Sequence, residues 1–282
     1  MPHLPGLDRT IEAALAEDLA LGDPTTTSLI PVHLTGRASF VSRQAGRLAG
    51  IDVALAVFKR VDPELRTKAM LLDGDIIEPG AVLGSVEGRV ASILTGERTA
   101  LNFLQRMSGI ATATALYVEA VAGTTATIVD TRKTAPGLRS LDKYAVAAGG
   151  GKNHRMCLGD GILIKDNHIA ALRAEGISLA QVVKRARTRA PHMVKIEVEV
   201  ETIVEAQEAI KGGADVILAD NIAADELAKV VALAKGKVMV EASGGITLEN
   251  VAEIARTGVN LISVGALTHS VKALDIGLDY DA

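Results

Sequence analysis

In the second half of the chain, short apolar runs alternate with segments in which apolar residues recur every three or four positions. The short runs predict buried strands, and the recurring positions predict amphipathic helices. The predicted strands are 126–130, 161–164, 194–200, 215–219, 238–241 and 261–264. The predicted helices are 138–148, 179–190, 202–211, 225–234 and 248–257.

This alternation of strands and helices predicts a parallel sheet that is covered by helices, because strands buried on both faces have nearly continuous apolar runs. Serial right-handed βα units close into a barrel or form a doubly wound sheet. No GxGxxG sequence opens a helix after a strand, so the dinucleotide-binding form of the doubly wound fold is disfavoured.

The first half of the chain has a different pattern. Residues 8–21 and 51–61 predict helices, and Asp8 is the expected cap of the first. Residues 37–43, 47–49 and 71–87 contain short apolar runs between turn signals such as Asp73-Gly74 and Pro79-Gly80, and they predict antiparallel strands. Residues 89–121 predict one long helix, or two that break near Gly109.

Composition excludes several classes of protein. The chain has 282 residues, 48% of them hydrophobic, which is enough for a substantial core. Aromatic residues make up only 2%, so surfaces that stack single-stranded nucleic acid are disfavoured. The single cysteine, Cys157, cannot form an internal disulfide. With no signal peptide and no spanning apolar run, the sequence predicts a soluble cytoplasmic protein.

The charge pattern singles out residues 130–168. The formal net charge of the chain is −4, yet this stretch is rich in cationic side chains. They are Arg132, Lys133, Arg139, Lys143, Lys152, Arg155 and Lys165, with His154 among them. A local positive field on an acidic protein indicates an anionic ligand, whereas a solvated basic surface is the alternative. The ligand is favoured because these charges follow predicted buried strands.

The active site of an α/β barrel lies where the strands end. The ends of the six predicted strands bring cations, carboxylates and glycine turns to one rim. In chain order these residues are Thr131, Arg132 and Lys133; Lys165, Asp166 and Asn167; Glu197 and Glu199; Asp220 and Asn221; Ser243, Gly244 and Gly245; and Gly265 and Ala266.

Each residue type suggests a role. Arginine binds carboxylate or phosphate through a planar fork, and lysine acts as a point charge. Glu199 and Asp220 suit Mg²⁺, which binds one or two carboxylates together with phosphate oxygens of the substrate. The glycine turns offer backbone N–H groups to a phosphate. The sequence therefore predicts a phosphorylated substrate, a metal ion and a second anion.

Structural roles remain open for several of these residues. Glu197 and Glu199 point the same way from one strand, and either could pair with Lys165 or Lys133 without catalysis. His154 by itself suits a hydrogen-bonded structural histidine better than a base, and Cys157 suits an inert small residue. No Ser/His/Asp order and no zinc-ligand spacing stands out.

Several motifs resemble quinolinate phosphoribosyltransferases in a specific order. They are EDLALGDPTTTSLI, GERTALNFLQRMSGIAT, TRKTAPGLR, GGGKNHRMCLGDGILIKDNH, KIEVEVE, ILADN, EASGGI and VGALTHS. A paralogous group linked to molybdenum transport is similar, but its counterpart of IKDNH usually differs, so this motif favours the quinolinate enzymes.

The resemblance implies an α/β fold in two domains. Residues 1–112 are expected to form an open-faced α/β sandwich, on which 270–282 is expected to pack. Residues 113–269 are expected to form an incomplete six-stranded α/β barrel that carries the catalytic site.

The resemblance also implies a reaction of NAD biosynthesis. Quinolinate attacks C1 of phosphoribosyl pyrophosphate, pyrophosphate leaves with Mg²⁺, and the C2 carboxylate is lost as CO2 to give nicotinate mononucleotide. The expected catalytic residues are Lys133, Lys165, Glu199 and Asp220, with Glu199 and Asp220 as metal ligands.

The implied binding residues divide between the two substrates. Quinolinate is expected to bind Arg132, His154, Arg155 and Lys165, together with Arg98 from the other subunit of a homodimer. Phosphoribosyl pyrophosphate is expected to bind Lys133, Glu199 and Asp220, with Ser243, Gly244, Gly245 and Gly265 around a phosphate. The alternative is a non-catalytic anion-binding module, from which Lys133, Glu199 or Asp220 would be expected to be missing.

Overall fold

The structure is a computed structural model that describes residues 4–281. The chain forms two compact units. Unit 1 contains the described residues up to Ala115, together with Thr134–Gly150 and the segment from Leu267 onward. Unit 2 contains Leu116–Lys133 and Gly151–Ala266. The segment Thr134–Gly150, which lies within the range expected for the barrel domain, thus groups with unit 1.

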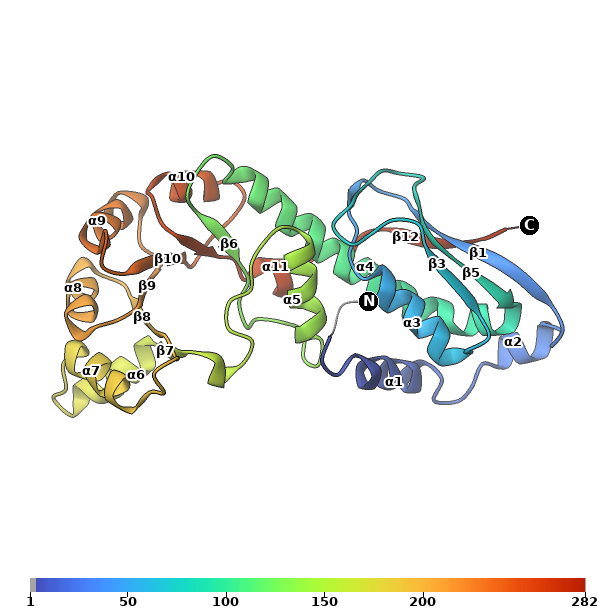
Figure 1. The fold of residues 1–282 in the computed structure, drawn as a ribbon, viewed down its shortest axis with the longest axis horizontal. Coiled ribbons are helices and arrows are strands. Elements are labelled where there is room, and N and C mark those ends of the chain that lie inside the picture. The colour runs from blue at the N-terminus through green and yellow to red at the C-terminus, as the bar shows by residue number, and fades with distance from the viewer. Residues whose placement is uncertain (1–3, 282) are drawn as a thin grey trace. The chain divides into compact units, whose positions relative to one another are not determined.

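Unit 1 is built on an antiparallel four-stranded sheet in the order β12-β1-β5-β3 (Figure 1). These strands are β1 (Thr35–Ser42), β3 (Arg66–Ala69), β5 (Val82–Arg89) and β12 (Ile276–Asp281). The short strands β2 (Gly46–Arg47) and β4 (Ile76–Ile77) pair separately. The last strand therefore returns to pair with the first, Arg37 lying opposite Asp281 and Ser42 opposite Ile276.

Most helices of unit 1 bury apolar faces that the sequence pattern displays. They are α1 (Leu7–Asp18), α2 (Pro24–Leu29), α3 (Ile51–Val61) and α5 (Arg139–Ala148), with most of the long helix α4 (Val90–Ala120). α3 packs on β3 and β5, and its Phe58 meets Phe40 of β1 edge to face with ring centroids 5.9 Å apart. This contact lies in the core of the unit, where both rings are fully buried.

Unit 2 contains a parallel six-stranded sheet in the order β6-β11-β10-β9-β8-β7 (Figure 1). The strands are β6 (Thr127–Val129), β7 (Ile162–Ile164), β8 (Ile196–Val200), β9 (Val216–Asp220), β10 (Met239–Ser243) and β11 (Leu261–Ser263). All six overlap the ranges predicted from the apolar runs. β6 and β7 are the two ends of the sheet, so the barrel is incomplete, as the resemblance implied.

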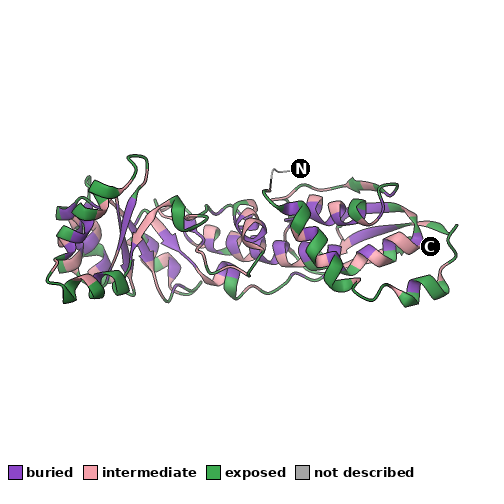
Figure 2. Cartoon of the chain, turned by 90° about the horizontal axis from the view of Figure 1, so that it is seen from below, coloured by how far each residue is buried: buried purple, intermediate pink, exposed green. Residues whose placement is uncertain are grey.

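Helices cover the outside of this sheet. They are α6 (Asp166–Ala174), α7 (Leu179–Arg189), α8 (Ile203–Gly212), α9 (Ala224–Ala234) and α10 (Val251–Arg256). The short helix η1 (Leu158–Asp160) precedes β7, and α11 (Ala266–His269), which follows β11 in the chain, belongs to unit 1 except for its first residue. The strands are mostly buried, and the outer faces of the helices are exposed (Figure 2). No helix among residues 4–281 is long and apolar enough to cross a membrane.

Not every local prediction was correct. α1 is preceded by Gly6 in the left-handed region, and Asp8 lies within the first turn and does not cap it. The sequence pattern did not predict helix α2, which Asp23 caps by accepting a hydrogen bond from the Thr26 N–H at 2.9 Å. Of the two alternatives for residues 89–121, one long helix is confirmed, since α4 runs through Gly109 without a break. Glycine is needed at this position because a Cβ would lie 2.2 Å from the Lys272 carbonyl oxygen.

Candidate active site

A cavity of about 380 Å³ lies at the carboxyl ends of the barrel strands. All of its lining residues belong to unit 2, and every strand of the sheet, or the segment directly after it, contributes at least one. The predicted site residues among them are Arg132, Lys133, His154, Arg155, Lys165, Glu199, Asp220 and Ser243. Parallel strands bring these positions together because their carboxyl ends share one rim.

Arg132 and Arg155 form the cationic centre of this cavity. Both side chains are partly buried, and Arg132 Nε is a buried donor that has no hydrogen-bond partner among the described residues. Burial and the charge of Arg132 lower the pKa of Arg155, although Glu197 acts in the opposite direction. Two guanidinium groups close enough to repel each other, one with an unsatisfied donor, create a site for an anion.

The loop that carries His154 and Arg155 is held by the end of β6. Asp130 is fully buried, and its carboxylate accepts hydrogen bonds from the His154 backbone N–H at 2.8 Å and from Asn153 Nδ2 at 2.7 Å. Lys152 forms a parallel bridge with Val129. Arg155 donates to the Gly161 carbonyl oxygen at 3.1 Å. These bonds fix residues 152–155 beside β6, which has no neighbouring strand on that side.

The carboxylates of the cavity lie on β8 and β9. Lys165, directly after β7, donates from Nζ to Glu199 Oε2 at 2.8 Å. This is one of the structural ion pairs that the sequence left open for Glu199. Asp220, the last residue of β9, accepts from Asn221 Nδ2 at 2.8 Å through Oδ2. The second oxygen of each carboxylate has no hydrogen bond within residues 4–281. Hard oxygen donors of this kind suit Mg²⁺.

The turn after β10 is glycine-dependent for two reasons. Gly244 has φ +85° and Gly245 has φ +60°, values that side chains disfavour. A Cβ at Gly244 would also lie 2.3 Å from Asn221 Oδ1. The Asn221 N–H donates to the Ser243 carbonyl oxygen at 2.9 Å, so the ends of β9 and β10 are tied together.

His154, Glu197 and Glu241 form a buried cluster at the base of the cavity. The Arg155 N–H donates to His154 Nδ1 at 2.8 Å, so the ring proton lies on Nε2 and points to Glu197 Oε2 at 3.0 Å. Glu241 Oε2 lies 3.7 Å from the same nitrogen. Both oxygens of Glu241 and Glu197 Oε1 have no hydrogen-bond partner in the described part of the chain.

Burial and the neighbouring Glu197 raise the pKa of Glu241 to about 8, against the opposing effect of His154. The Glu241 carboxyl is therefore neutral at pH 7, because an ionised carboxylate in this position would be both desolvated and next to like charge. One ligand atom from each of His154, Glu197 and Glu241 lies within 4.8 Å of the others, a spacing that would also allow a cation. Either a proton on Glu241 or a bound cation would therefore reduce the negative charge of this cluster.

The remaining predicted residues lie outside the cavity lining. Gly244 and Gly245 form the turn after Ser243, and Gly265 follows β11 and leads into α11. Arg98 is an exposed residue of α4 in unit 1. No role for Glu241 is predicted from the sequence, although an acidic residue inside the apolar run VMVEAS is a signal of a buried functional carboxyl.

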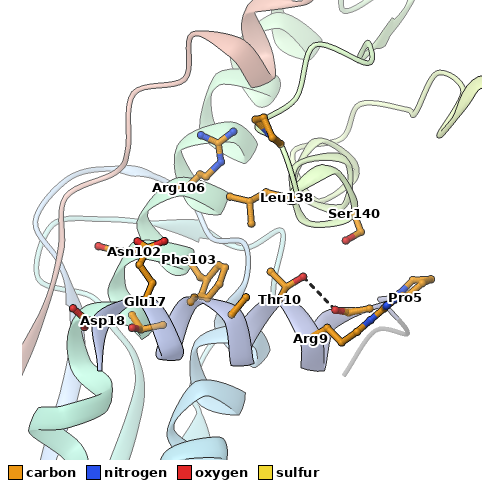
Figure 3. Close-up of a pocket in the computed structure, with 16 residues that line it drawn as sticks. Pro5, Arg9, Thr10, Glu17, Asp18, Asn102, Phe103, Arg106, Leu138 and Ser140 are labelled. Carbon is orange, nitrogen blue, oxygen red and sulfur yellow. Dashed lines mark hydrogen bonds between the residues drawn. The ribbon is translucent and has the colours of Figure 1, made fainter. Parts of the chain in front are cut away.

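Unit 1 has a larger hollow, of about 780 Å³, between α1, α4 and residues 136–140 (Figure 3). Arg106, on α4, is the cation at one end of it, and its guanidinium is bound to Asp142 at 2.8 Å and 2.9 Å. Toward the other end, Thr10 on α1 donates from its hydroxyl to the Gly6 carbonyl oxygen one turn earlier in the chain. None of the predicted site residues lines this hollow, so it does not compete with the barrel cavity as a catalytic site.

The fold and the site define an α/β-barrel enzyme whose substrate carries several negative charges. The comparisons with known proteins narrow this class. Residues 23–108 match the N-terminal domain of quinolinate phosphoribosyl transferase, and residues 110–279 match its C-terminal domain. The chain therefore belongs to the quinolinate phosphoribosyl transferase family.

Individual relatives agree with this assignment. A probable nicotinate-nucleotide pyrophosphorylase [carboxylating] of Bacillus subtilis is 45% identical, over 99% of this chain and 94% of its own. Quinolinate phosphoribosyltransferase [decarboxylating] 1b of Nicotiana tabacum is 44% identical, over 98% of this chain and 82% of its own. The solved nicotinate-nucleotide pyrophosphorylase of Francisella tularensis superimposes with a TM-score of 0.92 at 36% identity, covering 100% of this chain and 98% of that one.

Proposed function

We propose that the chain carries out its family's reaction in the barrel cavity, with the residue roles given below. The reaction is phosphoribosyl transfer from phosphoribosyl pyrophosphate to quinolinate with decarboxylation, a step of NAD biosynthesis, and family membership confirms that prediction. The chain is accordingly a pentosyltransferase of pyridine nucleotide biosynthesis.

The observation that best supports the residue roles is the pair Arg132 and Arg155. Quinolinate is a dianion on a small pyridine ring, and its carboxylates would satisfy the partnerless Arg132 Nε and relieve the repulsion between the two guanidinium groups. Lys165 lines the same cavity and adds a third cation. His154 directs its ring proton to Glu197, so its contribution to quinolinate is to orient the neighbouring Arg155 backbone.

Phosphoribosyl pyrophosphate is assigned to the β8–β11 side of the cavity. Lys133 provides charge for the diphosphate, and the turn Ser243–Gly245, with Gly265, provides backbone N–H groups for the 5′-phosphate. Asp220 and Glu199 lie on the two neighbouring strands β9 and β8. Two anionic substrates, a dicarboxylate and a diphosphate, would then meet in this one cavity.

Glu199 and Asp220 are the residues that would hold Mg²⁺. The fit rests on two carboxylates that line one cavity and keep one oxygen each without a hydrogen bond in the described chain. When bound, Mg²⁺ would neutralise charge that develops on the departing pyrophosphate. Lys165 holds Glu199 in place from the quinolinate side, and Lys133 stabilises the leaving group electrostatically, which is usually the largest kind of catalytic contribution.

We further propose that the active form is a homodimer in which Arg98 completes the partner's site. Arg98 is exposed on α4 and could reach another molecule. The cytoplasmic location predicted from the sequence stays a prediction.

The competing function is that of a non-catalytic anion-binding module. Lys133, Glu199 and Asp220 all line the cavity, which favours the enzyme. The deciding experiment is an assay of pyrophosphate release. Release that requires both quinolinate and phosphoribosyl pyrophosphate supports the enzyme, whereas binding without release supports the module.

The metal assignment gives a second test. Glu199→Gln and Asp220→Asn are expected to lower the rate by at least about 100-fold and to change the Mg²⁺ dependence, because each removes one anionic metal ligand. Circular dichroism is expected to show an unchanged fold. Glu201→Gln, at an exposed position just beyond β8, is the matched control and should behave like the wild type. Full activity with the wild-type Mg²⁺ dependence in both variants would refute the assignment.

A further inference from the structure

A second cavity, of about 270 Å³, lies at the opposite end of the barrel strands. Its lining includes the residues that begin the strands or precede them, among them Ile162, Lys195, Val216 and Met239. The substrate cavity instead lies where the same strands end. The sheet of unit 2 therefore encloses two separate spaces, one above the other along the strand direction.

Glu241 is shared by the two cavities. It lines the substrate cavity together with Arg132, Lys165 and Ser263, and it lines the second cavity together with Glu197 and Met239. Only 1% of the residue is exposed, and neither carboxyl oxygen has a hydrogen bond of ordinary geometry among residues 4–281, although the side chains of Ser263 and Glu197 influence its protonation. A buried polar group without a partner is costly, so a role that needs this group at this level of the barrel is indicated.

The groups that face Glu241 favour a protonated carboxyl. Glu197 approaches from β8 and adds negative charge, while His154 approaches from the loop beside β6 and already donates its ring proton to Glu197. Ser263 of β11 contributes a hydroxyl, and Leu218 of β9 is apolar. Arg155 lines both cavities and carries a permanent positive charge. Glu241 is thus a protonated carboxyl group between the substrate cavity and the second cavity.

The reaction needs such an acid, an argument that rests on the proposed function. Loss of the carboxylate at C2 of the pyridine ring leaves an electron pair on that carbon, and the product carries hydrogen there. Arginine does not give up a proton near neutral pH. Lys165 is bound to Glu199, Lys133 is assigned to the diphosphate, and the His154 ring proton points at Glu197.

We propose that Glu241 is the acid that protonates C2 of the pyridine ring as the C2 carboxylate leaves as carbon dioxide. The bond between C2 and its carboxylate breaks, and the electron pair stays on C2 next to the cationic ring nitrogen. The O–H bond of Glu241 breaks and a C2–H bond forms, which leaves Glu241 as a carboxylate. Water reaching the second cavity then returns a proton to Glu241, so that the cycle closes without any oxidant or reductant.

The test separates the two halves of the reaction in a single turnover of the whole protein. Glu241→Gln keeps the shape and neutrality of the side chain but has no acidic proton. Pyrophosphate release is expected to stay within a few-fold of the wild-type rate, whereas carbon dioxide release should slow by about 100-fold or more, the usual contribution of a general acid. The reaction should then accumulate the nucleotide that still carries both carboxylates. Glu253→Gln, at an exposed position of α10, is the matched control and should release both products at wild-type rates.

The pH dependence gives an independent readout. Glu241 keeps its proton below its pKa of about 8 and loses it above, so carbon dioxide release by the wild type is expected to fall as the pH rises through that value. This decline should be missing from the residual activity of Glu241→Gln. A residue that only supports the fold would change the amplitude of the pH profile and not its shape.

Three results would overturn the proposal. The first is equal slowing of pyrophosphate and carbon dioxide release in Glu241→Gln, which would mean a structural or binding role. The second is an unchanged pH profile in that variant. The third is a stoichiometric metal ion in the purified wild type that is lost in Glu241→Gln, because a cation would then occupy the place of the proton. A wild-type protein that releases no pyrophosphate from the two substrates would instead contradict the proposed function itself.

Discussion

At the scale of the residue, the proposed catalytic cavity is marked by two guanidinium groups that lie close together. Arg132 and Arg155 are partly buried and close enough for the charge of one to lower the pKa of the other. Lys165, by contrast, is paired with Glu199 at 2.8 Å. A site in which two guanidinium groups repel each other, with Glu197 opposing only part of this effect on Arg155, suits a ligand that brings two negative charges.

Arg132→Ala is expected to weaken quinolinate binding by about 2–5 kcal/mol, because a charge-assisted hydrogen bond is lost in a desolvated site. Binding of phosphoribosyl pyrophosphate should change far less, since other residues are assigned to it. Titration calorimetry with each substrate separately measures both effects. Arg185→Ala, at an exposed position of α7, is the matched control. Unchanged quinolinate affinity in Arg132→Ala would remove this residue from the carboxylate site.

At the scale of the element, the ends of β9 and β10 act as one assembly. Asn221 has φ 54°, the one positive value of a non-glycine residue among those that the structure describes. Its side chain lies against Gly244, and its backbone N–H donates to the Ser243 carbonyl oxygen. It directly follows Asp220, the candidate metal ligand. The turn Ser243–Gly245 and the Asp220 carboxylate are therefore positioned together.

Gly244→Ala is expected to damage both stability and substrate binding. The left-handed backbone costs about 1–2 kcal/mol for a residue with a Cβ, and the clash with Asn221 adds to that value. Gly213→Ala at the end of α8 is the control, because it has φ +91° but nothing within 4 Å of its Cβ. Chemical denaturation should show a larger loss for Gly244→Ala, and only this variant should raise the KM for phosphoribosyl pyrophosphate. Equal losses in stability would mean that Asn221 moves aside freely.

The apolar pattern of each strand or helix explains which elements could be predicted from the sequence. The six barrel strands are predictable because each is an apolar run, interrupted internally only by Glu197 and Glu199 in β8 and by Glu241 in β10. α3 is predictable at its observed ends because its apolar face is periodic. β3, with the sequence Arg-Thr-Lys-Ala, was missed because its side chains are half exposed and no apolar signal remains. β12 was missed for a related reason, since a strand at the edge of a sheet is partly exposed and varies in pattern.

Among site residues, those at strand ends were predictable because charge after an apolar run is visible in the sequence. Arg132, Lys165 and Asp220 are examples. Glu241 was not assigned a role, because its importance depends on Glu197 and His154, which reach it from other parts of the chain. Proximity of this kind follows from the closure of the sheet and not from spacing along one strand.

At the scale of the whole molecule, the proposed dimer makes each site depend on two chains. The cavity residues belong to unit 2, whereas Arg98 belongs to unit 1. In a closed two-fold dimer the same surface is used twice, so each Arg98 would complete the opposite site. A local surface role for Arg98 is the alternative.

Complementation distinguishes these two possibilities. Arg98→Ala and Lys133→Ala chains are each expected to be inactive, and a mixture that exchanges subunits should recover about a quarter of the wild-type activity, because half of the dimers would hold one intact site of two. Native mass spectrometry can establish that exchange has occurred. Exchange without any recovery would place Arg98 outside the partner's site.

The pairing of β12 with β1 has a consequence for how the chain folds as it is synthesised. β1 emerges early from the ribosome, but one of its edges is covered only by a strand that follows the entire barrel. Until β12 arrives, that edge presents unpaired backbone groups, which are a template for pairing with other nascent chains. The barrel can form in the meantime, so unit 2 is free to fold before unit 1 is complete, although unit 1 begins first.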